Sequence, residues 1–207
     1  MVTLIHVLLV PLTSRGVVEF LDGLAASTRE VLREAGLEAE VSVWPNKLKV
    51  PIKCFDWERL QYHAGCLVKY VKDYFQQLGP LRGVYVVAIG YLDGFEHGLN
   101  FVFGEAGPAY GVAAVFTKRL KPEFYGEKPD YNLYYERLVK EVVHELGHLL
   151  GLEHCDNPKC VMRFSNSIVE VDEKTRYFCE KCSKKLRQLY VQYKIGDPLV
   201  LGLQNPH

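Results

Sequence analysis

Residues 144–154 read HELGHLLGLEH, a dense combination of histidine, glutamate and glycine within a largely apolar stretch. His144 and His148 are four residues apart, so on a helix they lie on the same face, one turn from each other. Gly151 can adopt a left-handed backbone conformation that turns the chain out of the helix, and His154 can then return as a third imidazole. Three imidazoles leave the fourth position of a tetrahedral zinc ion open, which is typical of a catalytic zinc site.

Glu145 directly follows the first of these histidines and is the predicted general base. It would take a proton from zinc-bound water and deliver it to the amine that leaves a cleaved peptide bond. The alternative is an ordinary helix with these residues on a solvated face. The neighbouring Val142, Val143 and Leu146 disfavour it, because they predict a mostly buried helix in which unpartnered His and Glu would be costly.

Two further pairs of residues predict a second metal site. Four of the six cysteines form two closely spaced pairs, and four thiolates make a closed tetrahedral set that is typical of structural zinc. Reduced buried thiols or disulfides are the alternative for these four. The pairs are Cys155 with Cys160 and Cys179 with Cys182.

The other two cysteines lie outside these patterns. Cys66 falls on an apolar helical face and is expected to be a free core thiol, and Cys54 lies near a turn after Pro51. An intracellular, reducing environment favours metal ligands or free thiols over disulfides for all six.

The extended HExxHxxGxxH motif followed by Met162 resembles the metzincin metallopeptidases, and its continuation into the cysteine pairs resembles the archaemetzincin family in particular. Residues 100–106, NFVFGEA, are also similar to the region that precedes the active-site helix in that family. The resemblance implies an α/β metzincin-like fold: a twisted mixed sheet with backing helices and an active-site helix, and a small zinc-stabilised C-terminal subdomain. The corresponding boundaries are 1–151 and 152–207, within a single catalytic domain.

The same resemblance implies a role for each motif residue. Two zinc ions per chain are expected, one catalytic and one structural, and Met162 would form the turn beneath the catalytic zinc. An edge strand within 100–117 would pair with extended substrate. Phe164 stands where some metzincins have a tyrosine that approaches the metal, so no phenolic group is available there. The implied ligands are His144, His148 and His154 for the catalytic zinc and Cys155, Cys160, Cys179 and Cys182 for the structural zinc, with Glu145 as the base.

Hydrophobic patterning predicts alternating strands and helices in the first half of the chain, which is typical of a largely parallel sheet. Asp56 is a candidate cap for the second helix. The segment 104–108, Gly-Glu-Ala-Gly-Pro, is predicted to be a turn. The expected strands are 4–12, 38–44, 84–92, 100–103 and 111–117, and the expected helices are 16–35, 56–78, 132–150 and 180–193.

The composition sets outer bounds on function. The chain has 207 residues, 48% of them hydrophobic, which excludes global disorder. With 25 basic and 25 acidic side chains the formal net charge is zero, which disfavours a nucleic-acid or acidic-membrane partner.

No basic residue precedes the apolar segment 2–12, so it is predicted to be a buried strand and not a signal peptide. We therefore expect a cytoplasmic, monomeric enzyme that acts on peptides or proteins. The competing hypothesis is a non-catalytic, zinc-stabilised binding module whose active site is empty or inhibited.

Overall fold

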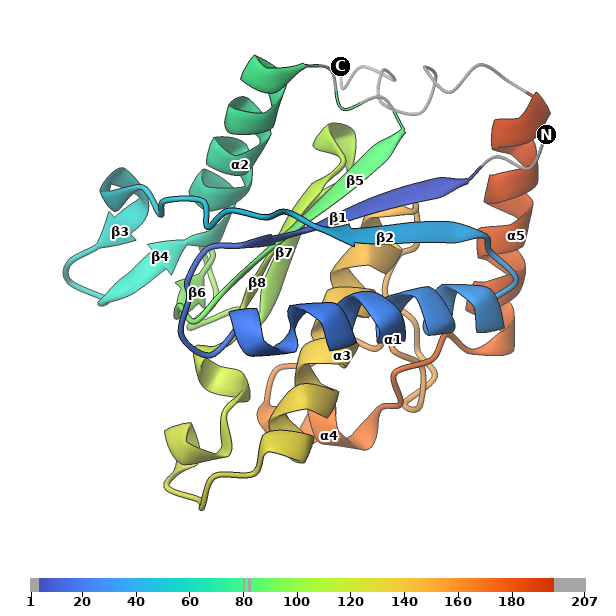
Figure 1. The fold of residues 1–207 in the computed structure, drawn as a ribbon. Helices are drawn as coiled ribbons and strands as arrows, with labels where there is room; N and C mark the ends of the chain where they lie inside the picture. Colours follow the sequence, from blue (N-terminus) through green and yellow to red (C-terminus); the bar gives the residue numbers. More distant parts are fainter. Residues whose placement is uncertain (1–3, 80, 82, 196–207) are drawn as a thin grey trace.

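A computed structural model describes residues 4–79, 81 and 83–195. Its centre is a five-stranded mixed sheet with the strand order β2-β1-β5-β8-β7 (Figure 1). The strands β2, β1, β5 and β8 run parallel to one another, and β7 pairs antiparallel with β8 at the edge. The bounds are β1 Ile5–Pro11, β2 Ala39–Val43, β5 Val84–Gly90, β7 Gly104–Gly107 and β8 Val112–Phe116.

Helices cover both faces of this sheet, which explains why its central strands are apolar throughout. One face packs against α1 (Leu21–Glu34) and α3 (Tyr131–Leu149), and the other face packs against α2 (Ala64–Leu78). Figure 1 shows α1 and α3 on the same side of the sheet and α2 on the opposite side. The α/β fold that the sequence predicts is thus confirmed.

The chain after α3 contains two further helices, α4 (Ile168–Glu173) and α5 (Glu180–Ile195). The long helix α5 agrees with the predicted helix 180–193, whereas the short α4 was not predicted. The predicted subdomain boundary at residue 151 falls just beyond the end of α3. The last part of the predicted C-terminal subdomain, residues 196–207, lies outside the described residues.

The edge strand corrects one sequence-based expectation. Residues 104–107, read as turn material, form β7, while residues 100–103 make only a single bridge, from Val102 to Gly94. The glycines misled the prediction because they usually mark turns. In the folded chain Gly104 is required by the close approach of α3, since a Cβ there would collide with the carboxylate of Glu145.

The region before α2 corrects a second expectation. Asp56 does not cap a helix: its side chain accepts hydrogen bonds from the backbone N–H groups of Glu58 and Arg59 and closes a tight turn. This turn joins β3 (Phe55–Asp56) to β4 (Gln61–His63), and β4 also pairs with β6 (Gly94–Phe95) in a small second sheet. The helix α2 begins only after His63, whose Nδ1 accepts from the N–H of Cys66. The remaining short 3-10 turns are Val18–Phe20, Ile52–Cys54, Pro108–Tyr110, Lys118–Leu120 and Pro122–Tyr125.

Cys54 and Cys66 form a disulfide, so the expectation of a free core thiol at Cys66 is wrong. The Cα atoms are 5.5 Å apart, within the range that a disulfide can bridge. No local pattern indicates this proximity, because it depends on the hairpin of β3 and β4 folding back onto α2. Within the described part of the chain, no helix is long and apolar enough to cross a membrane.

Candidate active site

The active-site helix α3 carries His144, Glu145 and His148 on one face at the floor of a cleft. Asp130 caps its first turn by accepting from the N–H of Leu133. The helix ends where Gly151 adopts a φ of 90°, a left-handed conformation that favours glycine. This turn leads the chain back so that His154 joins the two helical histidines, as the sequence predicts.

The three imidazoles converge on one point. Their candidate ligand nitrogens all lie within 4.8 Å of one another, and the Nε2 atoms of His144 and His148 are 3.2 Å apart. The Nδ1 atoms of these two rings lie 2.8 Å from the backbone oxygens of Val161 and Leu152, respectively. Because a carbonyl oxygen only accepts, both Nδ1 atoms carry the proton and both Nε2 lone pairs are free.

Burial keeps these rings neutral, since desolvation lowers the pKa of His144 well below its usual range and also lowers the pKa of His148 and of His154. Two unprotonated nitrogens 3.2 Å apart repel each other unless a cation lies between them and the third ring. The donor set therefore fits a zinc ion with three imidazole ligands.

Glu145 lies beside this group and is only 4% exposed. Burial, reinforced by the negative charges of Glu141 and Glu105, raises the pKa of its carboxyl well above the usual range. Its carboxylate packs against the backbone of Gly104 on β7, so the edge strand passes directly over the base. A carboxyl in this setting is suited to hold a proton and then release it.

Met162, the predicted turn methionine, is fully buried beneath the helix. Its sulfur packs so closely on Gly147 that a Cβ there would collide with it. The preceding residue, Val161, supplies the carbonyl that orients His144, and Met162 itself accepts from the N–H of Cys155. Phe164 lies beside the predicted third ligand, with its ring centroid 4.9 Å from that of His154, so the neighbour of that imidazole is an apolar ring.

The four remaining cysteines form a second cluster. The sulfurs of Cys155, Cys160, Cys179 and Cys182 all lie within 4.8 Å of one another, close enough for a single ion. Burial raises the pKa of Cys160 to about 11 and also raises that of Cys182, so the thiolates need a cation to form at neutral pH. The set fits a closed, structural zinc site.

The cleft above the histidines has a volume of about 590 Å³. One wall is formed by residues 98–106 and thus by the edge strand β7, and the other is formed by α3 and by residues 164–166. This arrangement places the open edge of the main sheet along the cleft, next to the predicted metal ligands.

Sequence reasoning missed a buried ion pair in this cleft. Lys174 contacts Glu141 at 2.8 Å, with side-chain exposures of 0% and 3%. Glu141 lies one helical turn before Glu145, and this spacing was the available signal that both carboxylates lie on the same face of α3. No sequence signal pointed to Lys174, because 32 residues lie between it and Glu141, including the end of α3, the first cysteine pair and α4.

A third group, His63, Glu96 and His97, also brings possible ligand atoms within 4.8 Å. His63 Nδ1, however, accepts the N–H of Cys66 at the start of α2, so its Nε2 carries the proton and lies 3.1 Å from Glu96. Because Nε2 is protonated, this group is a helix cap with an adjacent carboxylate, and it does not offer the lone pair that a metal needs.

Comparisons with known proteins agree with this geometry. Residues 14–188 match the family described as peptidase family M54. The archaemetzincin of Sulfolobus acidocaldarius is 48% identical over 181 residues, which cover 87% of this chain and 95% of the relative. A zinc-dependent peptidase from Methanocorpusculum labreanum has a similar structure, with a TM-score of 0.75, 31% identity, and coverage of 87% of this chain and 98% of that one. Archaemetzincin from Archaeoglobus fulgidus, solved with malonate, gives a TM-score of 0.70 at 36% identity, covering 87% and 99%. The chain therefore belongs to peptidase family M54, with the archaemetzincins, and is a zinc-dependent metallopeptidase.

Proposed function

We propose that this enzyme hydrolyses peptide bonds with Glu145 as the general base, at a zinc ion held by His144, His148 and His154. The observation that carries the proposal is the pair of free Nε2 lone pairs 3.2 Å apart beside a buried carboxyl. The rival hypothesis of a non-catalytic binding module gains no support from the comparisons, in which the relatives are peptidases.

Zinc and Glu145 would have different roles in peptide-bond hydrolysis. When bound, zinc supplies a Lewis acid that polarises the peptide carbonyl and lowers the pKa of a water molecule. Glu145 takes a proton from the attacking water and returns it to the nitrogen of the leaving amine. Its buried carboxyl favours the protonated state between these two steps, because desolvation raises its pKa.

The edge strand β7 is the proposed binding site for extended substrate. Its inner edge pairs with β8, and its other edge borders the cleft, so a peptide can add as a further strand. This narrows the substrate strand from the predicted region 100–117 to Gly104–Gly107.

We further propose a second, structural zinc bound by Cys155, Cys160, Cys179 and Cys182, and a C-terminal subdomain, 152–207, that depends on it. The convergence of the four sulfurs supports this assignment. A total of two zinc ions per chain follows.

We place the enzyme in the cytoplasm, where thiolates remain available for zinc. The disulfide between Cys54 and Cys66 is compatible with this placement only if the cell is one in which intracellular disulfides persist, as they do in hyperthermophiles. The monomeric state and the absence of nucleic-acid or membrane partners stay predictions.

The test is an unbiased peptide-library digest with Glu145→Ala as the matched variant. We expect wild-type protein to cleave and the variant to lose cleavage by at least about 100-fold, while elemental analysis gives the same zinc content for both. Cleavage that persists in Glu145→Ala, with no contaminating protease, would contradict the proposed mechanism.

A further inference from the structure

The cleft wall opposite α3 presents apolar side chains to any substrate. Leu99 and Phe101, which precede the edge strand β7, both line the cleft. Leu99 is 39% exposed, so its side chain is accessible to a ligand in the cleft. The nearby Val102 and Phe103 extend this wall towards β7. A substrate side chain that lies here exchanges water for apolar contact, which favours large aliphatic or aromatic residues.

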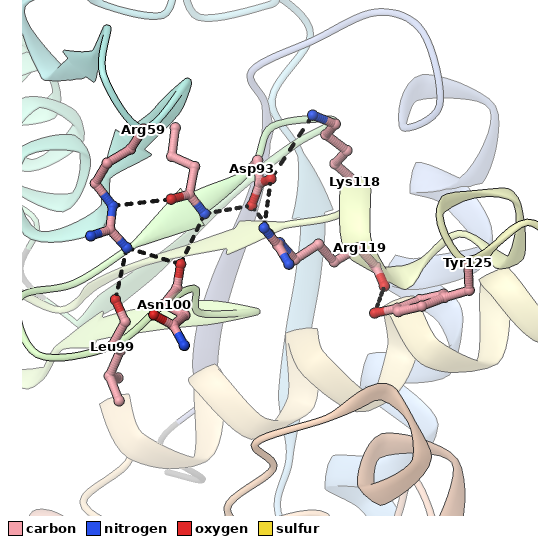
Figure 2. A network of polar contacts seen from close by, with 8 residues as sticks. Arg59, Asp93, Leu99, Asn100, Lys118, Arg119 and Tyr125 are labelled. Atoms are coloured by element: carbon pink, nitrogen blue, oxygen red, sulfur yellow. Dashed lines mark hydrogen bonds and ion pairs between the residues drawn. The ribbon is translucent and has the colours of Figure 1, made fainter.

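Arg59, in the turn between β3 and β4, binds the backbone of this wall. Its guanidinium donates to the backbone oxygens of Leu99 and Asn100, both at 3.0 Å, as Figure 2 shows. The same group lies 4.4 Å from the ring centroid of Phe95, which restricts it further. The two carbonyl oxygens are therefore bound by the hairpin and are not offered to substrate.

Asp93 connects the residues that support Asn100 and Phe101 in one hydrogen-bond network (Figure 2). Its carboxylate, only 8% exposed, accepts from Arg119 Nε at 2.7 Å and from Gln61 Nε2 at 3.1 Å. Gln61 also donates to the backbone oxygen of Asn100, and the Arg119 guanidinium lies 4.5 Å from the ring centroid of Phe101. One buried carboxylate thus fixes both the backbone and the aromatic ring of the wall.

We propose that Leu99 and Phe101 form a subsite for a large apolar substrate side chain, and that Arg59 and Asp93 are positioning residues that fix its shape. The proposal rests on the proposed peptidase function for its ligand, a peptide. The hairpin of β3 and β4 does not line the cleft itself but supports its wall through the contacts of Arg59 with Leu99 and Asn100, and no motif of the sequence marks this role.

The first test measures binding without turnover. Zinc-loaded Glu145→Ala protein is titrated with fluorescent peptides that differ only by leucine, alanine or lysine at each position in turn. We expect tighter binding of leucine at one position, a preference reduced about fivefold by Arg59→Ala and partly restored by Arg59→Lys. In the active enzyme, Arg59→Ala should lower the ratio of kcat/KM for the leucine peptide to kcat/KM for the alanine peptide about fivefold, mainly through a higher KM for the leucine peptide.

Leu99→Ala provides a second variant that retains the backbone carbonyl bound by Arg59 and should remove the same preference. Arg33→Ala, at an exposed position near the end of α1, is the matched arginine control and should bind as the wild type does. The proposal is overturned if Arg59→Ala lowers binding or kcat equally for all peptides, or if Leu99→Ala keeps the leucine preference. A protein that shows the preference but cleaves nothing would support the subsite and contradict only the proposed peptidase mechanism.

Discussion

At the scale of single residues, the buried pair of Glu141 and Lys174 sets the electrostatic environment of the base. Both side chains are withdrawn from water, and each neutralises the other at 2.8 Å. Lys174→Met should lower the free energy of unfolding by about 3–5 kcal/mol, because it leaves a buried carboxylate unpaired. The double variant Glu141→Gln/Lys174→Met should recover most of that loss in urea unfolding. Additive losses in the double variant would show that the two side chains do not act as a pair.

Gly104 is the residue at which the edge strand approaches the base most closely. Gly104→Ala should lower kcat/KM about 100-fold, because its Cβ would collide with the Glu145 carboxylate and displace it. Zinc content should stay near the wild-type value, because the added methyl group meets Glu145 and not the histidines, whereas the unfolding midpoint should fall because the buried Glu145 side chain has to move. A variant with wild-type kcat/KM would mean that β7 does not constrain Glu145.

At the scale of elements, local patterns predicted what depends on local sequence. The spacing of apolar residues predicted α3 to within one residue at each end, and the His and Cys spacings predicted both clusters, because the ligands come from one helix turn and short loops. The strand β7 and the hairpin of β3 and β4 could not be predicted in this way. Their glycines and polar residues resemble turns, and only non-local pairing with β8 and β6 defines them as strands.

The hairpin is also the element that the disulfide secures. The bond between Cys54 and Cys66 closes a loop with a sequence separation of 12 that contains both β3 and β4. Cys54→Ser/Cys66→Ser should lower the free energy of unfolding by about 2–3 kcal/mol, since the unfolded chain regains the freedom of that loop. The bond itself is checked by alkylating the denatured, metal-free protein without reductant. Mass spectrometry should find the four zinc-cluster cysteines labelled and Cys54 and Cys66 unlabelled.

At the scale of the whole molecule, the two proposed metal sites share one segment of chain. His154 and Cys155 are adjacent, and Cys155 donates its N–H to the backbone oxygen of Met162 beneath the active-site helix. Two side chains of α3 also bind α4. Arg137 forms an ion pair with Asp172 through two hydrogen bonds, and Lys140 Nζ donates to the backbone oxygen of Val171. We therefore expect the position of His154, the proposed third ligand of the catalytic zinc, to depend on the cysteine cluster through its neighbour Cys155.

Coupling between the two zinc sites is reciprocal in free energy, but mutation of one ligand set should cost more zinc than mutation of the other. Cys179→Ser/Cys182→Ser should remove the structural zinc and also reduce the zinc bound by the histidines, because His154 lies next to a displaced ligand. His144→Ala/His148→Ala should leave the cysteine cluster intact, since none of its ligands comes from α3. Elemental analysis should then give about one zinc per chain for the histidine variant and clearly less than one for the cysteine variant. Equal zinc contents in the two variants would mean that the sites load independently despite the shared segment.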